Sequence, residues 1–170
     1  MDRVPTAYLL TFTCYGQWLH GDARGSIGRV EGKRTTAILP HDPDLEGLSR
    51  GTLAGERYEL NEQARRVVLD AIGHVCRHRV WTLYAAHVRP THVHVVVAAD
   101  SAPERVIGDF KAYATRALRT AGVAGARQRL WTALGSTRYL WDWEAVERAM
   151  RYVVDEQGEP MAVFELQSGC

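Results

Sequence analysis

The 170-residue chain is 46% hydrophobic and 24% charged, which suits a single globular domain over residues 1–170 with a substantial core and excludes wholesale disorder. No apolar run approaches the roughly 20 residues of a transmembrane helix, and the N-terminus lacks a signal-peptide pattern, so we expect a cytoplasmic protein. Three widely spaced cysteines favour reduced thiols over a disulfide framework.

Charge is distributed unevenly, although its total is only +1. Between Arg105 and Arg138, seven basic residues stand against the single acid Asp109, a local charge of +6, whereas the chain from Tyr152 onward carries four acids and no base. Phosphate backbones respond to local potential, so this asymmetry favours a nucleic-acid partner. A solvated, arginine-rich helix face is the structural alternative.

The first expected strand is Ala7–Tyr15, a run of aromatic, aliphatic and threonine residues that is typical of a buried strand. After it the composition changes: residues 16 to about 60 are rich in glycine, lack periodicity and are expected to form a long irregular insertion. The Trp-bearing and Arg-bearing pieces at 16–34 favour a substrate-contacting loop, and a passive insertion is the other interpretation.

The first expected helix has Asn61 as its N-cap, an apolar stripe at helical spacing and a basic last turn that ends at Arg79. Two strands follow it, Trp81–Val88 and His92–Ala99. Only three residues separate these strands, which indicates an antiparallel hairpin.

A second helix is expected over 103–120, opened by a proline and apolar along one side. A short strand is expected near 138–141, and Asp142 then caps a last helix over about 143–157. The order β-α-β-β-α-β-α predicts an α+β, ferredoxin-like split βαβ fold with a central antiparallel sheet and an extra C-terminal helix.

A histidine pair lies in the second strand of the hairpin, within THVHVVV. His92 and His94 are two residues apart, so both imidazoles project from one face of the strand while the valines face the other way. Two imidazoles at this spacing suit one divalent cation. A half-exposed pair without a ligand is the alternative, but core packing does not require two histidines on a valine-rich strand.

In the last helix, Tyr152 precedes Glu156 by four residues, which places both on one helical face. A tyrosine hydroxyl can attack a phosphodiester whose charge a metal neutralises, and Glu156 is within reach of the same ion as a third ligand. An amphipathic helix with Tyr152 at the edge of the core is the alternative. Tyr113 and Tyr139 are weaker candidates for the nucleophile.

These motifs together resemble those of the single-tyrosine HUH transposases, which include insertion-sequence enzymes and REP-associated tyrosine transposases. THVHVVV matches the HUH motif, with Val93 as the hydrophobic middle residue, and the late YVVDEQG is similar to the tyrosine helix. The opening AYLLTFTCYGQWLHGD is similar to the first strand of bacterial members. The resemblance covers Ala7 to about Pro160.

The resemblance implies a transposase and endonuclease that cleaves and rejoins single-stranded or hairpin DNA. His92 and His94 would hold Mg²⁺ or Mn²⁺, and Tyr152 would be the nucleophile, forming a 5′-phosphotyrosine and a free 3′-hydroxyl. Many members have Gln or Asn four residues after the tyrosine, where this chain has Glu156. Helical geometry favours Glu156 as the third ligand, whereas a bent helix end would bring in Gln157.

The helix over 103–120 is expected to track DNA phosphates through Lys111, Arg116 and Arg119, at least two of which share a face. Three tryptophans offer stacking surfaces for unpaired bases, or else pack at the edge of the core: Trp131, Trp141 and Trp143.

Two other classes of function stay open. A domesticated relative would bind hairpin DNA without cutting it, and a metal-dependent phosphodiesterase would use the same histidines without a covalent intermediate. Insertion-sequence relatives work as dimers with exchanged helices and REP-associated ones can be monomeric, so the resemblance allows both a homodimer and a monomer.

Overall fold

The computed structural model describes residues 4–17, 26–30, 33–39, 56–126 and 129–167, and its core is an antiparallel sheet of five strands. The strands are β1 (Ala7–Cys14), β4 (Thr82–Val88), β5 (His92–Ala98), β6 (Trp131–Leu140) and β7 (Ala162–Glu165). The described helices are α2 (Glu62–Arg79), α3 (Pro103–Thr120) and α4 (Trp143–Asp155).

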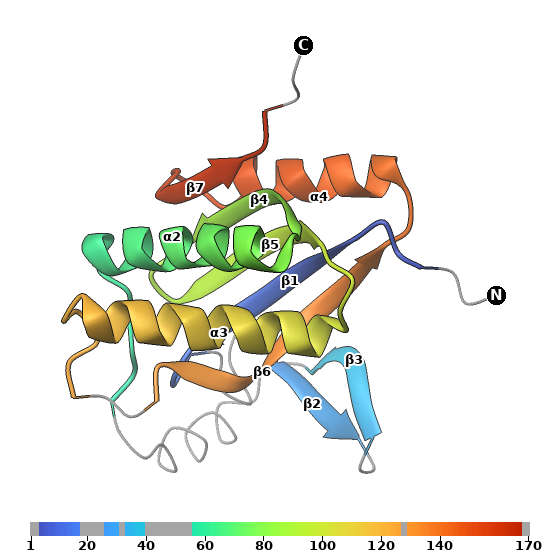
Figure 1. The fold of residues 1–170 in the computed structure, drawn as a ribbon. Coiled ribbons are helices and arrows are strands. Elements are labelled where there is room, and N and C mark those ends of the chain that lie inside the picture. Colours follow the sequence, from blue (N-terminus) through green and yellow to red (C-terminus); the bar gives the residue numbers. More distant parts are fainter. Residues whose placement is uncertain (1–3, 18–25, 31–32, 40–55, 127–128, 168–170) are drawn as a thin grey trace.

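The strand order is β6-β1-β5-β4-β7, and every neighbouring pair is antiparallel. Helices α2 and α3 cover one face of the sheet, whereas α4 packs on the other (Figure 1). Without α4 and β7, this is the order of a ferredoxin-like split βαβ fold, so the expected α+β fold class is confirmed. No helix in the described part of the chain is long and apolar enough to cross a membrane.

Strand β5 shows why the two faces of the sheet differ. Val93, Val95 and Val97 are fully buried in the larger core cluster, which the sheet forms with α2 and α3. Val96 points the other way, into the smaller cluster beneath α4. Because strand side chains alternate between faces, His92 and His94 lie on the α4 side, as the sequence pattern predicts.

Two of the three described helices, α2 and α4, begin at side-chain caps. Asn61 Oδ1 accepts a hydrogen bond from the Ala64 amide at 2.8 Å, and Asp142 Oδ1 accepts one from the Ala145 amide at 2.8 Å. Each cap satisfies an amide that the first helical turn leaves without a partner. Both predicted N-caps are confirmed, while α4 ends at Asp155, before the expected end near residue 157.

The last two strands differ from expectation. Strand β6 has ten residues, where a short strand near 138–141 is expected, because pairing with β1 extends it over a stretch of low strand propensity that includes Gly135. Strand β7 is not predicted at all. It is only four residues long and forms by pairing with β4, which the local sequence does not reveal.

The segment expected to be irregular contains a second, two-stranded antiparallel sheet made of β2 (Ser26–Val30) and β3 (Lys33–Leu39). The expectation of irregular structure is therefore wrong for these two stretches. Residues 18–25, 31–32 and 40–55 lie outside the described residues, and with them much of the suggested substrate-contacting loop.

Candidate metal and nucleophile site

Neighbouring strands and loops orient the two histidines of β5. In the β1–β5 pairing, His94 lies opposite Thr11, and the Thr11 hydroxyl hydrogen-bonds to Nδ1 of His94 at 2.7 Å. The Thr91 hydroxyl makes the equivalent contact with Nδ1 of His92 at 3.0 Å. Such contacts on one ring nitrogen fix the orientation of the ring and so direct its other nitrogen.

The last turn of α4 brings Tyr152 to this pair. The ring centroids of His92 and His94 are 4.8 Å apart, and those of His94 and Tyr152 are 5.8 Å apart, both in edge-on arrangements. His94 is 5% exposed, whereas Tyr152 is 39% exposed. The cluster therefore combines a buried histidine with a phenol that is accessible from solvent.

Beyond the end of α4, Gln157 reaches the histidines. Its Nε2 donates to the Tyr152 carbonyl at 3.1 Å, and its side chain also hydrogen-bonds to His94. Glu156 is the exposed C-cap residue, and the described residues contain no metal-binding group of three His, Cys, Asp or Glu side chains. The structure thus brings Gln157 to His94, whereas Glu156 is exposed at the C-cap.

Burial sets the charge state of His94. It is the largest of the causes that lower the pKa of this imidazole to about 3; the nearby His92 and His87 contribute to the lowering, while the hydrogen bond to Gln157 acts in the opposite direction. His94 is therefore neutral at pH 7, which is the form that binds metals.

The donor set of this cluster fits a divalent cation. Imidazole nitrogens suit first-row transition metals, and an amide carbonyl such as that of Gln157 suits Mg²⁺ or Mn²⁺. Of these two ions, Mn²⁺ satisfies both kinds of donor.

Thr11 is a site residue that the sequence does not reveal. Its hydroxyl lies beside His94 only because β1 and β5 pair in one particular register. The only signal in the sequence is a pair of threonines, Thr11 and Thr13, on the otherwise apolar first strand.

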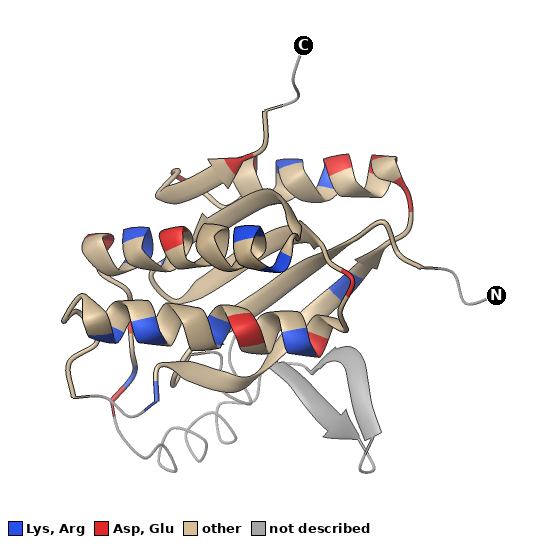
Figure 2. Cartoon of the chain, in the orientation of Figure 1, with Lys and Arg blue, Asp and Glu red and all other residues tan. Residues whose placement is uncertain are grey.

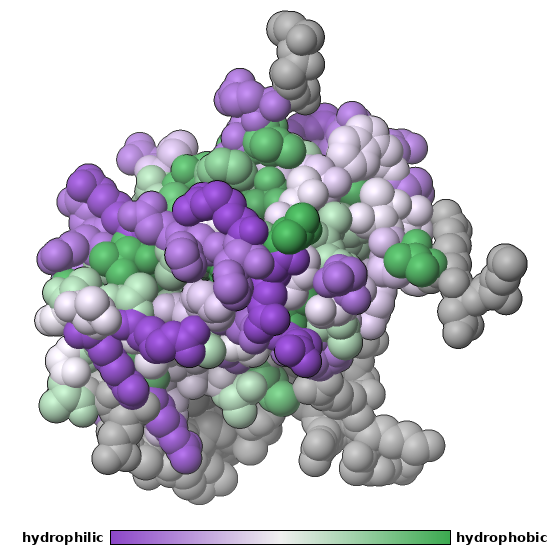
Figure 3. Space-filling view, in the orientation of Figure 1, coloured by the Kyte–Doolittle hydropathy of each residue, from purple (hydrophilic) through white to green (hydrophobic). Residues whose placement is uncertain are grey.

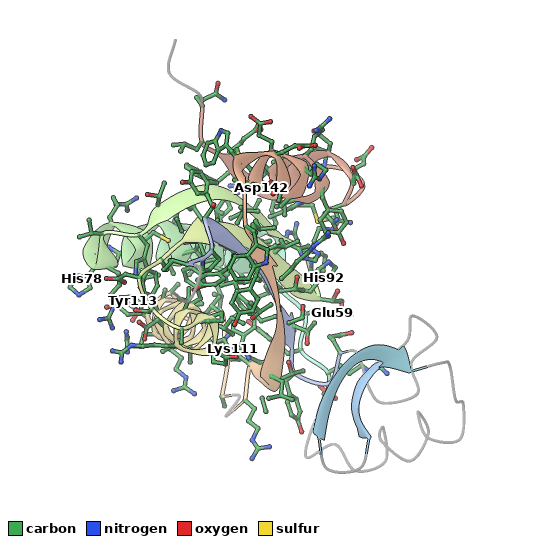
Figure 4. All side chains as sticks on the ribbon, turned by 90° about the vertical axis from the view of Figure 1, so that its right-hand side faces the viewer. Glu59, His78, His92, Lys111, Tyr113 and Asp142 are labelled. Carbon is green, nitrogen blue, oxygen red and sulfur yellow. The ribbon has the colours of Figure 1, made fainter. Side chains whose placement is uncertain are left out.

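The residues expected to bind DNA lie on α3, which covers the face of the sheet opposite α4. Figure 4 shows Tyr113 of α3 on the side of the sheet away from His92. The guanidinium of Arg116 lies over the Tyr113 ring at 4.4 Å, and Arg116 and Arg119 are both exposed. Figure 2 shows the basic residues of α3 along this outer surface, and Figure 3 shows hydrophilic residues across much of it.

Lys111 differs from those two arginines because its ammonium group is engaged inside the protein. Nζ donates to the carbonyl oxygens of Thr132 at 2.8 Å, Leu134 at 3.1 Å and Ala133 at 3.5 Å. Lys111 thus links α3 to the first half of β6.

The three tryptophans also differ from one another. Trp131 is partly buried, and its Nε1 donates to the Thr115 hydroxyl at 3.0 Å. Trp141 stacks on Tyr139 with centroids 5.7 Å apart, and Trp141 and Trp143 are 41% and 53% exposed. Trp131 therefore packs against the core, and the other two present aromatic surface to solvent.

The strand order and the helices place this chain among ferredoxin-like α+β proteins. A solved structure of a REP-associated tyrosine transposase bound to a REP hairpin has a similar fold, with a TM-score of 0.54 and 11% identity over 92% of this chain and 69% of that chain. At this identity the likeness shows the fold alone. No protein-family model and no curated protein matches the sequence.

Proposed function

We propose that this protein cleaves and rejoins single-stranded DNA, with Tyr152 as the nucleophile and a divalent cation held by His92, His94 and Gln157. The proposal rests on the observation that these four side chains, from β5 and from the end of α4, lie together in the structure. The fold shared with a transposase bound to a DNA hairpin supports DNA as the substrate.

The proposed reaction is a transesterification. Tyr152 Oη attacks the scissile phosphorus, a new phosphorus–oxygen bond forms, and the bond to the 3′-oxygen breaks. The phenolic proton passes to water and the leaving oxygen takes one up, which gives a 5′-phosphotyrosine and a free 3′-hydroxyl. A bound Mg²⁺ or Mn²⁺ ion would neutralise charge on the phosphate. Attack by another 3′-hydroxyl reverses the step, so rejoining needs no ATP.

DNA contacts on α3 belong to the same proposal. Arg116 and Arg119 are exposed on α3, which covers the face of the sheet opposite the histidines, where they would bind phosphates of a hairpin stem. Because Lys111 is engaged with carbonyls of β6, we assign phosphate binding to the two arginines. A DNA molecule that contacts both faces has to pass around an edge of the sheet.

Covalent attachment to DNA tests the proposed nucleophile. Wild-type protein incubated with labelled hairpin DNA and Mn²⁺ should form an adduct that survives denaturation, and Tyr152→Phe should abolish it without changing DNA affinity. Tyr113→Phe and Tyr139→Phe are matched controls that should retain the adduct. Loss of the adduct in a control but not in Tyr152→Phe would contradict the assignment. DNA binding without any adduct would identify a non-catalytic hairpin binder instead, and cleavage without one a phosphodiesterase.

Metal-induced stabilisation tests the ligand set. Mn²⁺ should raise the melting temperature of wild-type protein and of Glu156→Ala, whereas His92→Ala and Gln157→Ala should lose most of that rise because each removes a ligand. The measurement is thermal unfolding with Mn²⁺ and with a chelator. A rise that vanishes in Glu156→Ala and persists in Gln157→Ala would show that Glu156 is the third ligand.

A further inference from the structure

A third histidine lies beneath α4, on the strand next to the metal-site histidines. His87 of β4 pairs with His94 across the β4–β5 ladder and with Val163 across the β4–β7 ladder. It is 0% exposed, and both of its ring nitrogens have backbone partners on the α4 side of the sheet.

These partners select one tautomer of the ring. Nδ1 lies 3.0 Å from the Val153 carbonyl, which can only accept, and Nε2 lies 3.3 Å from the Met161 amide, which can only donate. Nδ1 therefore carries the proton and Nε2 accepts. Burial lowers the pKa of His87, which agrees with a neutral ring.

The two partners lie at the two ends of the connection from α4 to β7. Val153 follows Tyr152 in the last turn of α4, and Met161 directly precedes β7. The His87 ring therefore bridges the ends of the loop at 156–161. Arg89, at the end of the same hairpin strand, donates from Nη1 to the Glu159 carbonyl in the middle of this loop at 2.7 Å.

The loop held in this way carries Gln157, and the helix end beside it carries Tyr152. The carbonyls of the last helical turn have no partners within the helix, so a helix end without external donors frays. The Val153 carbonyl receives its hydrogen bond from His87, and the Tyr152 carbonyl receives one from Gln157.

We infer that His87 is a positioning residue that holds the end of α4 and the 156–161 loop so that Tyr152 and Gln157 face His94. This inference rests on the proposed function for its catalytic consequence. Misplacing a nucleophile by about 1 Å can cost on the order of 100-fold in rate, so loss of both hydrogen bonds should affect the chemical step strongly.

Hydrogen exchange tests the structural half of the inference without any assumption about activity. In His87→Phe, which keeps a ring but loses both hydrogen bonds, amides at 153–161 should exchange at least about tenfold faster, while those of β5 stay protected. The control is Val75→Ala, a core change in α2 on the opposite face of the sheet. It should leave the exchange rates of the amides at 153–161 unchanged relative to those of β5. Equal protection of 153–161 in His87→Phe and wild type would overturn the inference.

A double-mutant cycle on the rate of adduct formation tests the catalytic half. His87→Phe should slow the single-turnover rate by about 10- to 100-fold without changing DNA affinity. In a Gln157→Ala background, His87→Phe should slow adduct formation by a clearly smaller factor, because both residues act on the same loop. His87→Asn, which retains an amide donor for the Val153 carbonyl, should recover part of the rate.

The outcomes separate the inference from the proposed function. The inference would be overturned if the losses in the rate of adduct formation caused by His87→Phe and Gln157→Ala were additive. It would also be overturned if Val75→Ala lost as much of this rate as His87→Phe, with both variants compared at the same interval below their melting temperatures. Either result would mean that His87 only stabilises the fold in general. A wild-type protein that never forms an adduct would overturn the proposed function, and the placement of the loop by His87 would then be decided by the hydrogen-exchange result.

Discussion

At the scale of one residue, Lys111 is a basic side chain whose hydrogen bonds are made within the protein. Its ammonium group donates to carbonyls at the start of β6, and Nζ lies 5.9 Å from the centroid of the Phe12 ring. Burial lowers the pKa of Lys111 to about 8, so the group is still mainly protonated at pH 7. The charged ammonium group therefore helps to hold β6, an edge strand of the sheet, against α3.

We predict that Lys111→Met lowers the free energy of unfolding by about 1–2 kcal/mol, because methionine keeps much of the apolar stem and loses the donors to β6. Denaturant unfolding measures this loss. Arg105→Met, an exposed change on the same helix, is the control and should stay within about 0.5 kcal/mol of wild type. Equal stability of Lys111→Met and wild type would show that the carbonyl contacts contribute nothing.

At the scale of elements, the closeness of β1, β6 and α3 depends on a glycine. A Cβ added at Gly135 of β6 would lie 2.8 Å from the Thr11 carbonyl oxygen of β1 and 3.0 Å from Cδ1 of Ile107 of α3. The same Thr11 holds the ring of His94 through its hydroxyl. Packing of β6 against β1 is thus linked through Thr11 to the support of the His94 ring.

Gly135→Ala should lower the free energy of unfolding by about 1–3 kcal/mol, because backbone atoms of β1 and β6 must move apart. Gly108→Ala is the matched control: it lies within α3 with no atom within 4 Å of the added Cβ, and it should stabilise by about 0.5–1 kcal/mol. Thermal or urea unfolding of both variants measures the difference. Destabilisation by Gly108→Ala and none by Gly135→Ala would contradict the packing described for β6.

At the scale of the whole molecule, the sheet separates two surfaces with different chemistry. The α4 side holds the histidines and Tyr152, whereas the α2–α3 side presents Arg116 and Arg119 on α3. In the proposed function, chemistry and phosphate binding therefore occur on opposite faces. A change on one face should leave the other intact.

The salt dependence of DNA binding checks the role of the α3 surface. Arg116→Ala and Arg119→Ala should each reduce the slope of log affinity against log salt by about 0.7 for a single-stranded contact or about 0.9 for a duplex contact. Both should weaken all sequences alike, since phosphate contacts position DNA without specifying sequence. Lys111→Met should leave the slope unchanged. Unchanged slopes in both arginine variants would place the DNA elsewhere.

Much of the fold could be predicted from the sequence because its signals are local. Asn61 and Asp142 are predicted as caps and observed as caps, since a cap needs only its own helical turn. The alternation around His92 and His94 likewise places both rings on one side of β5, because it depends only on the strand period. The position of Tyr152 in the last helix is likewise predicted, because the Asp142 cap and the helical period are local signals.

Tertiary structure decided the contacts that depend on chain segments far apart in sequence. Helical spacing favours Glu156 as the partner of Tyr152, yet α4 ends at Asp155 and the chain turns back to pair β7 with β4, which leaves Gln157 beside His94. Lys111 is basic in sequence, but the position of β6 engages its charge. The sequence by itself determined the three described helices, the strands β1, β4 and β5, and the residue types of the site, because these follow from periodicity and caps. The position of Gln157 beside His94, the hydrogen bonds of His87 to both ends of the 156–161 loop and the two separate faces follow from long-range strand pairing, which no local pattern encodes.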